Sequence, residues 1–213
     1  MSEPKKTILF DFDGTLAETM MLIHEVFNGL SSVYGYRHLP AEEIETARHL
    51  SIREFIDFVD IPIWKVPIIA IHARRKMHAS MDQILPPKGL VDVLTQIHTS
   101  GLYFMDILTS NRRKNVLRFL SQHRINWFDE VESTRAILSK KKRVEKYIRQ
   151  KGLNPDDLFY IGDTTVDVES ARHAGAQTVA VSWGLNTRQA LEKANPDFLV
   201  DDPAELLSIF PAV

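Results

Sequence analysis

The chain has 213 residues, of which 44% are hydrophobic and 25% are charged, and its formal net charge at pH 7 is -2. A chain of this length and composition can bury a sizeable core, either as one large domain or as a core with a small insert. The small net charge excludes an overall electrostatic attraction to nucleic acid or to an anionic membrane, and the absence of cysteine excludes disulfides, a thiol nucleophile and zinc-thiolate sites.

The N-terminal segment, residues 1–14, has a short apolar run that contains acidic residues, and it has no small-residue cleavage site. These features are typical of neither a signal peptide nor a membrane anchor. Nowhere in the sequence does an apolar stretch approach the roughly 18 residues that a membrane helix needs. We therefore expect a cytoplasmic protein with no membrane partner.

The first predicted element is a strand over residues 7–12. Its β-branched and aromatic residues are typical of a buried parallel strand. Asp11 and Asp13 come at the carboxyl end of this strand, and Gly14 follows them. The acidic side chains are therefore expected where the strand meets a loop.

A helical pattern follows from residue 17 to about residue 85. Ser51 and Glu54 form a predicted capping box at the start of one of its helices. Pro67 is suited to the first turn of another helix that continues through Met77. Proline and glycine then punctuate the chain, and this makes residues 85–88 a candidate hinge.

The rest of the chain alternates between strand and helix patterns after a first helix that carries Leu90, Leu94 and Ile97. The predicted strands are residues 102–109, 128–132, 158–162, 177–182 and 197–200. The predicted helices between them are residues 112–123, 141–151, 164–174 and 187–194.

This alternation predicts an α/β fold with a Rossmann-like, doubly wound and mostly parallel sheet that carries helices on both faces. The long helical stretch separates the first strand from all the others. We therefore expect a small all-helical cap domain, residues 17–86, inserted after strand one of a core domain made of residues 1–16 and 87–213.

Polar residues follow three of the predicted strands, at the edge where open α/β sheets bind their ligands. They are Asp11, Asp13, Ser110, Asn111 and Asp163, with Asp167 four residues further on. Since residues four apart share one face of a helix, Asp163 and Asp167 can point to one site if a helix begins at Thr164. Crowded carboxylates need a cation among them, and their hard oxygen atoms favour Mg²⁺.

Each of these segments also has a purely structural interpretation. The sequence DFDGT can be a strand that ends in an Asp-Gly turn, and Ser110 with Asn111 can begin a helix. The acids of GDTTVD can stabilise the first turn of a helix through its dipole. Because the start of a helix is also where anions bind, the structural and functional interpretations are compatible.

Four segments resemble, in order and spacing, the four motifs of the haloacid dehalogenase superfamily. They are DFDGTLAET at 11–19, LTSN at 108–111, SKKKRV at 139–144 and GDTTVD at 162–167. The resemblance covers nearly the whole chain and is greatest to the phosphoglycolate phosphatase-like branch, whose helical cap lies between the first and second motifs.

The resemblance implies a phosphoryl-transfer site. Asp11 would be the nucleophile that attacks phosphorus, and Asp13 would be the general acid and base that protonates the leaving oxygen and then activates water. Lys140 would balance the negative charge of Asp11 and of the phosphate. Displacing halide needs no proton, whereas an alkoxide needs one, so the position of Asp13 favours a phosphatase over a dehalogenase.

The resemblance also implies which residues bind the substrate and the metal. The substrate-binding residues of the core would be Gly14 and Thr15, through backbone N–H groups, and Ser110 and Asn111. The residues that hold the Mg²⁺ cofactor would be Asp11, Asp163, Asp13 through its main-chain carbonyl, and Asp167 in a supporting position.

The basic residues leave some assignments open. The third motif offers Lys140, Lys141 and Lys142 in a row, and we assign the active lysine to Lys140 because Val144 then lies on the helix face that Ile148 continues. In the helical segment, Arg48 and Arg53 flank a position where related caps read the substrate, although each could also be a surface arginine. His49 and Trp183 could approach the cleft, and the run from Arg74 to Lys76 is expected to be solvated.

We therefore expect a Mg²⁺-dependent phosphatase that hydrolyses a small phosphate monoester through an aspartyl-phosphate. Phosphoglycolate is the first candidate substrate by resemblance, and the protein could act as a monomer or a homodimer. Two alternatives remain, a phosphomutase with the same four motifs and a catalytically silent binding or regulatory protein. The silent protein is disfavoured because every catalytic position holds the residue type that the chemistry needs.

Overall fold

The computed structural model describes residues 5–133 and 140–212. The start of the N-terminal segment and Ser139 of the third motif lie outside these described residues. The strands are β1 Lys6–Phe10, β2 Tyr103–Thr109, β3 Glu130–Ser133, β4 Leu158–Gly162, β5 Gln177–Val181 and β6 Phe198–Val200. The α-helices are α1 Met20–Tyr34, α2 Ile44–Arg48, α3 Ile52–Phe58, α4 Val66–Ser80, α5 Leu90–Ser100, α6 Arg113–Gln122, α7 Lys140–Lys151, α8 Thr165–His173, α9 Arg188–Lys193 and α10 Leu206–Ile209.

The six strands form one sheet in the order β3-β2-β1-β4-β5-β6, and every neighbouring pair is parallel. Phe10, the last residue of β1, lies opposite Ile107 of β2 on one side and Ile161 of β4 on the other. The order along the chain reverses at β1, since β2 and β3 lie on one side of it and β4 to β6 on the other. This is the doubly wound arrangement that the sequence predicts, and its ligand crevice belongs at the carboxyl ends of β1 and β4.

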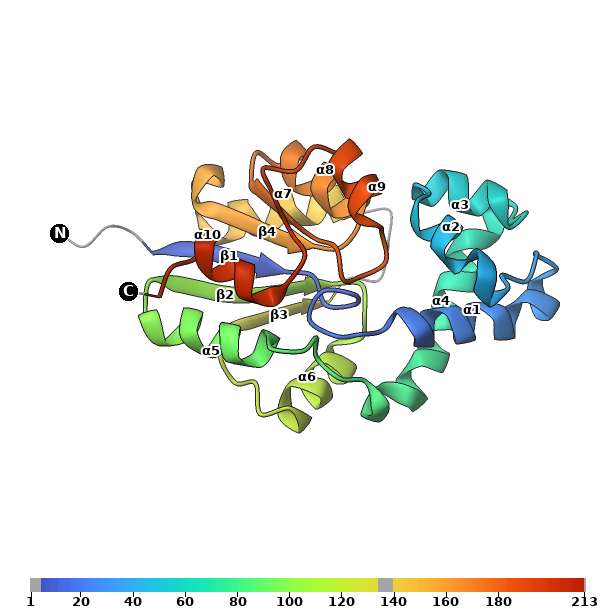
Figure 1. Ribbon diagram of the computed structural model, residues 1–213, viewed down its shortest axis with the longest axis horizontal. Helices are drawn as coiled ribbons and strands as arrows, with labels where there is room; N and C mark the ends of the chain where they lie inside the picture. The colour runs from blue at the N-terminus through green and yellow to red at the C-terminus, as the bar shows by residue number, and fades with distance from the viewer. Residues whose placement is uncertain (1–4, 134–139, 213) are drawn as a thin grey trace.

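Helices cover both faces of the sheet, as Figure 1 shows, with α7 and α8 on one face and α5 and α6 on the other. Side chains alternate along β1 because successive residues of a strand point to opposite faces. Ile8 and Phe10 belong to the buried cluster that includes residues of α5 and α6. Leu9 belongs to a second buried cluster with residues of α7 and α8.

Between β1 and α5 the chain forms a helical segment, residues 20–83, which lies beyond the carboxyl ends of the strands at one end of the molecule (Figure 1). Two of its helices, α3 and α4, begin where the sequence predicts. Ser51 and Glu54 form the capping box of α3, and Pro67 lies in the first turn of α4. The two connections to the sheet run side by side, because the Glu18 N–H donates to the carbonyl oxygen of Leu85 at 2.9 Å.

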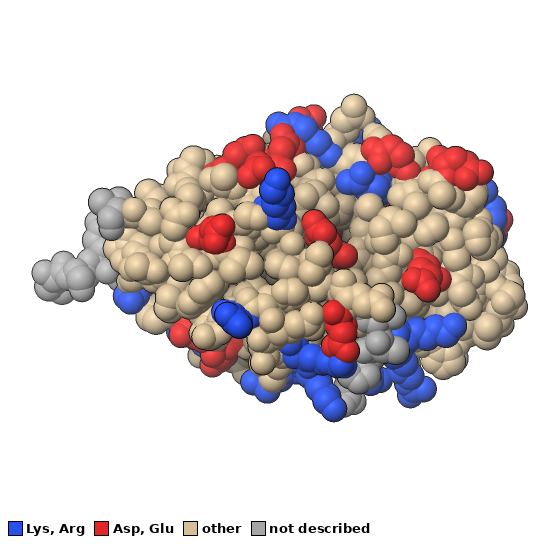
Figure 2. Space-filling view, turned by 60° about the horizontal axis from the view of Figure 1, so that its bottom comes forward, with Lys and Arg blue, Asp and Glu red and all other residues tan. Residues whose placement is uncertain are grey.

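No helix among the described residues combines the length and the apolar character needed to cross a bilayer. On the face drawn in Figure 2, acidic and basic side chains are interspersed over a largely uncharged surface. This mixture agrees with the net charge of -2. Strong local charge is found instead among the buried groups at the carboxyl ends of the strands.

Candidate active site

The loop after β1 presents Asp11 and Asp13 on the same side. The Asp11 N–H donates to the carbonyl oxygen of Ile161 at 2.8 Å, and this bond ties the start of the loop to β4. Phe12, between the two acids, points the other way into the core, where its ring meets that of Phe119 edge-on at 5.1 Å. Burial of Phe12 therefore leaves both carboxylates facing the crevice.

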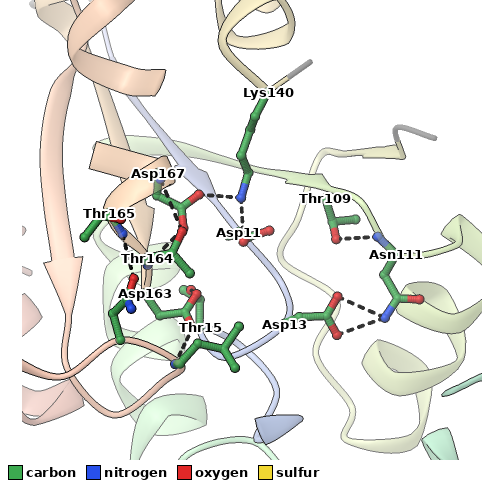
Figure 3. A network of polar contacts seen from close by, with 12 residues as sticks. Asp11, Asp13, Thr15, Thr109, Asn111, Lys140, Asp163, Thr164, Thr165 and Asp167 are labelled. Atoms are coloured by element: carbon green, nitrogen blue, oxygen red, sulfur yellow. Dashed lines mark hydrogen bonds and ion pairs between the residues drawn. The ribbon is translucent and has the colours of Figure 1, made fainter. Parts of the chain in front are cut away.

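Three carboxylates and one lysine converge at this crevice from distant parts of the chain. Ligand oxygens of Asp11, Asp163 and Asp167 all lie within 4.8 Å of one another, and all three residues are buried. The Lys140 Nζ lies 2.7 Å from the Asp11 Oδ2 and also forms an ion pair with Asp167 (Figure 3). Lys140 is thus the lysine that reaches the cluster, whereas Lys141 and Lys142 are exposed.

Asp163 is fully buried in a space that two glycines leave for it. A Cβ atom on Gly14 would lie 2.0 Å from the Asp163 Oδ2, and one on Gly184 would lie 2.3 Å from the same oxygen. The Thr15 hydroxyl donates to the Asp163 Oδ1 at 3.2 Å, and the Leu185 N–H donates to the Oδ2 at 2.7 Å. These contacts fix the direction of the Asp163 carboxylate.

Asp167 is held by the start of α8. Its Oδ2 accepts hydrogen bonds from the Thr164 N–H at 3.1 Å and the Thr164 hydroxyl at 2.5 Å, while its Oδ1 pairs with Lys140. The capping box of Thr164 and Asp167 is therefore also part of the charged cluster. The structural and the functional interpretations of this motif hold together.

Asp13 lies apart from the cluster, on the side of β2 (Figure 3). The Asn111 side-chain amide donates to both of its carboxylate oxygens, at 3.0 and 3.2 Å. Asn111 is fixed in turn, because its Oδ1 accepts from the Arg112 N–H at 2.7 Å and from the Asn115 amide at 2.8 Å. This chain of bonds orients Asp13 without pairing it to a cation of the cluster.

Burial dominates the proton affinities of the site. Burial raises the pKa of Asp11 to about 7, although Lys140 opposes this shift. Burial also raises the pKa of Asp13, and together with the charges of Asp167 and Asp11 it raises that of Asp163 well above its usual value. Burial acts to lower the pKa of Lys140, but Asp11 and Asp167 raise it well above the usual value.

The donor set fits a divalent cation. If all three carboxyl groups were ionised, the cluster would carry two negative charges that Lys140 does not compensate. Burial and this repulsion raise the pKa values of Asp11 and Asp163, and a bound cation would favour the ionised groups instead. All the candidate ligand atoms are hard oxygens, which suit Mg²⁺ better than a metal that prefers nitrogen or sulfur. The side chains of Asp11, Asp163 and Asp167 could hold the ion. The main-chain carbonyl of Asp13, which the sequence also suggests as a ligand, stays a prediction.

A cavity of about 390 Å³ opens over these groups. Its floor is made by residues of the sheet edge, namely Asp11, Asp13, Ser110, Asn111, Lys140, Asp163, Thr164, Thr165 and Val166. Its wall is made by residues of the helical segment, namely Met20, Ile23, His24, Phe27, Leu39, Ile44, Ala47, Arg48, Leu50, Ile52, Phe55, Ala70, Ala73, Arg74 and Met77. Leu185 and Asn186 join the two parts.

Gly14 and Thr15, which the sequence places among the substrate-binding residues, do not line this cavity. The Gly14 N–H donates to the carbonyl oxygen of Ala17 at 2.9 Å, and the Thr15 N–H is directed to that of Phe12 at 3.3 Å. Both N–H groups therefore form hydrogen bonds within the loop after β1. Both residues contact Asp163 on the side that faces away from the cavity. The close fit explains why the loop needs glycine with φ of 77° at position 14.

The two arginines singled out in the helical segment differ in position. Arg48 lines the cavity, but its Nε and Nη2 donate to the carbonyl oxygens of Leu185 and Gly184 at 3.2 and 3.1 Å, and its Nη1 pairs with Glu45 at 2.9 Å. It thus joins the helical segment to the loop after β5. Arg53 is exposed and lies outside the cavity lining.

His49 and Trp183 also lie outside the lining of the cavity. The His49 Nε2 is 3.1 Å from the Gln189 Oε1, a contact between α2 and α9. The Trp183 indole N–H donates to the carbonyl oxygen of Thr15 at 3.1 Å. Both residues therefore contact the core away from the cavity.

Two features of the cavity were not predicted from the sequence, namely the position of Arg74 and the apolar character of the wall. Arg74 does not share the solvated position of its neighbours Arg75 and Lys76, because it is half-buried and lines the cavity. A signal was available in the spacing of Ala70, Ala73, Arg74 and Met77, which lie on one face of α4. What the sequence could not supply was the surface that this face meets.

Comparison with known proteins agrees with this geometry. A sequence model of the family "Haloacid dehalogenase-like hydrolase" matches residues 8–181. A phosphoglycolate phosphatase of Synechococcus elongatus is 31% identical over 203 residues, covering 95% of each chain. Pyrophosphatase PpaX of Bacillus cereus is 26% identical over 208 residues and also covers 95% of each chain. The crystal structure of a predicted phosphatase from Clostridium acetobutylicum superposes with a TM-score of 0.81 at 17% identity, over 98% of this chain and 99% of that one.

Proposed function

Given that this chain belongs to the haloacid dehalogenase-like hydrolase family, we propose that it hydrolyses a small phosphate monoester with Mg²⁺ through a phosphoryl group carried on Asp11. Its phosphatase relatives support the reaction class. The observation that carries the proposal is the convergence of Asp11, Lys140 and Asp163 at the floor of a cavity that Asp13 also lines, with the buried Asp167 beside them. The relatives' names do not agree on a substrate.

In the first step, a carboxylate oxygen of Asp11 attacks phosphorus, and the bond between phosphorus and the ester oxygen breaks. A carboxylate and a phosphate repel each other, so the approach requires positive charge close to both. The Lys140 ammonium, 2.7 Å from the Asp11 Oδ2, supplies one such charge. A bound Mg²⁺ held by Asp11, Asp163 and Asp167 would supply the rest of the neutralisation and orient the phosphoryl oxygens.

Asp13 is the group suited to move protons. The departing ester oxygen needs a proton, and burial raises the pKa of Asp13, which favours the protonated acid that can supply it. The resulting carboxylate then takes a proton from the water that attacks phosphorus and releases phosphate from Asp11. The two hydrogen bonds from the Asn111 amide hold Asp13 in place throughout.

Ser110 follows β2, precedes α6 and lines the cavity, where its hydroxyl can bind a phosphoryl oxygen. The helical segment acts as a cap in this proposal. It corresponds to a domain of residues 17–86 on a core of residues 1–16 and 87–213, and its paired connections at Glu18 and Leu85 are where opening would occur. Closure of the cap excludes bulk water from the phosphoryl group.

Phosphoglycolate is the first substrate to test, because a relative that covers 95% of this chain carries that name. The test is release of inorganic phosphate from a panel of phosphate esters with Mg²⁺, compared between the wild type and Asp11→Asn. We expect hydrolysis that requires Mg²⁺ and falls on the order of 10⁴-fold or more in the variant. Equal activity of the two proteins would refute Asp11 as the nucleophile.

The intermediate can be tested separately by rapid acid quenching during turnover, followed by mass analysis of the peptide that contains Asp11. A phosphoryl group on Asp11 supports the proposal, and its absence during active turnover contradicts it. The same reactions separate the phosphatase from a phosphomutase. Release of one phosphate for each ester consumed indicates hydrolysis, whereas an isomerised ester without free phosphate indicates a mutase.

A further inference from the structure

The wall of the cavity differs in chemistry from its floor. Among the described residues that line the wall, all but His24, Arg48 and Arg74 are apolar. Ile23, Phe27 and Phe55 are only partly buried although they are large and apolar, and their residual exposure includes the surface that lines this cavity. A ligand that covers them removes apolar surface from water and so gains binding free energy.

His24 and Arg48, two polar residues of the wall, form hydrogen bonds with protein groups. The His24 Nε2 lies 2.8 Å from the carbonyl oxygen of Leu39. The Arg48 guanidinium donates to the loop after β5 and to Glu45. Asn186, at the junction of wall and floor, donates to the carbonyl oxygens of Arg48 and Leu50 and accepts from the Thr165 N–H.

Arg74 belongs to the phosphate end of the cavity. It is close enough to Asp13 and Arg112 for both charges to act on its pKa, which burial lowers. Its cation therefore lies near the group proposed to protonate the leaving oxygen. The other side chains of the wall can bind a substrate through apolar contacts and a complementary shape, and not through hydrogen bonds.

We propose that the substrate is a phosphate monoester whose leaving group is apolar, such as an arylalkyl or cycloalkylmethyl alcohol. This inference rests on the proposed phosphatase reaction and narrows its substrate class. The hydroxyl groups of a polyol leaving group would lose their hydration against the apolar side chains of the wall without gaining hydrogen-bond partners from them. The volume of about 390 Å³ also falls within the range of small-molecule pockets and exceeds what a two-carbon leaving group fills.

A matched pair of probes isolates this property. In cyclohexylmethyl phosphate and in glucose 6-phosphate, a CH₂ group joins a six-membered ring to the ester oxygen. The two esters differ in the ring oxygen and in the hydroxyl groups, which only glucose 6-phosphate has. Their affinities are measured by titration calorimetry with Mg²⁺ and the Asp11→Asn protein, which does not turn the ligands over. We expect cyclohexylmethyl phosphate to bind about 100-fold more tightly.

Two variants in the same Asp11→Asn background assign the effect to the wall. Ile23→Asn should weaken binding of cyclohexylmethyl phosphate about 10-fold and leave that of glucose 6-phosphate unchanged. Met21→Asn, two residues away on α1 but 61% exposed and outside the cavity, should change neither affinity. A conserved melting temperature shows that the variants fold.

Equal affinities, tighter binding of glucose 6-phosphate, or an equal loss for both ligands in Ile23→Asn would overturn the inference. Phosphoglycolate serves as a third ligand, and binding as tight as that of cyclohexylmethyl phosphate would also overturn it. These outcomes depend on binding alone. The proposed function is decided independently, by phosphate release from the wild-type protein with the same esters.

Discussion

The floor and the wall of the cavity are built on opposite physical principles. On the floor, charged side chains are buried and each is fixed by named partners, as when Asp163 accepts from Thr15 and Leu185. On the wall, apolar side chains are held by packing, as when the Phe27 ring contacts those of Tyr36 and Phe55 at 4.6 and 5.3 Å. A buried charge tolerates almost no change, whereas an apolar surface can be reshaped at small cost. The floor is therefore suited to determine the type of reaction, and the wall is suited to determine which leaving groups bind.

The largest effect that tests this contrast is expected from Asp13→Asn. The substitution keeps a side chain that can accept from Asn111 but removes the proton donor. We expect the kcat for an alkyl phosphate to fall about 10²- to 10⁴-fold, with a smaller loss for p-nitrophenyl phosphate because its leaving group needs no proton. Steady-state kinetics with both esters make the comparison, and the exposed Asp57→Asn is the control. Equal losses for the two esters would argue against an acid at this position.

The next effect distinguishes the lysines at the start of α7. Lys140→Met removes the cation that pairs with Asp11 and Asp167 while it keeps most of the side-chain volume. We expect kcat to fall about 10²- to 10³-fold, since the approach of the carboxylate to phosphate loses one of its charges. Lys141→Met changes an exposed residue and should retain wild-type kcat. A comparable loss in Lys141→Met would reassign the active lysine.

Mg²⁺ should stabilise the floor without affecting the wall. At an ion concentration about 100 times Kd we expect the free energy of unfolding to rise by about 2.7 kcal/mol, measured by chemical denaturation. The gain should be larger at about pH 8 than at about pH 5, because protons compete with the ion for the carboxylates. Asp11→Asn removes one ligand and should reduce the gain, whereas Ile23→Asn should keep it.

Without the ion, the sign of the pH dependence follows from Asp11. Its pKa rises from 3.8 to about 7 on folding, so the folded state keeps a proton that the unfolded state releases in this interval. The contribution of Asp11 to stability is therefore present below pH 3.8 and is lost as the pH rises to about 7. A stability in EDTA that increases over this interval would contradict the assignment.

The smallest effect is expected where the wall meets the core. Arg48→Ala removes the hydrogen bonds to the carbonyl oxygens of Gly184 and Leu185, and we expect a loss of about 1 kcal/mol in cap docking. This should appear as a rise of a few-fold in KM, with kcat nearly unchanged. Arg53→Ala alters an exposed arginine outside the cavity and provides the matched control. An equal change of KM in both variants would contradict a role of Arg48 in docking the helical segment on the core.

Much of the fold could be predicted because its signals are local. The apolar run of β1 and the capping box of Ser51 and Glu54 depend on residues that are close together in the chain. Each of the expected strands is present, with ends that differ from the prediction by at most two residues. The observed strand ends differ from the predicted ones because the last residues of a strand depend on the neighbouring strands with which they pair.

The position of the floor residues also followed from the sequence. In a doubly wound sheet the carboxyl ends of β1, β2 and β4 meet at one edge, so residues that follow these strands meet as well. Lys140 could be chosen over its neighbours because the apolar positions at Val144 and Ile148 fix the orientation of α7, and both are buried. In each case the regular geometry of a strand or helix fixed where the site residue lies.

The wall could not be predicted in this way, because it depends on how the helical segment sits over the sheet. The sequence alone determined the doubly wound, mostly parallel sheet, the acidic residues at the carboxyl ends of its strands and the lysine at the start of α7. These follow from the alternation of strand and helix patterns and from the period of each element. Only the tertiary structure decided that Arg48 faces backbone carbonyls, that Arg74 enters the cavity and that Ile23 and Phe27 line it. Those facts arise from contacts between surfaces distant in the chain, and amphipathic helices specify that an apolar face will be covered without specifying by what.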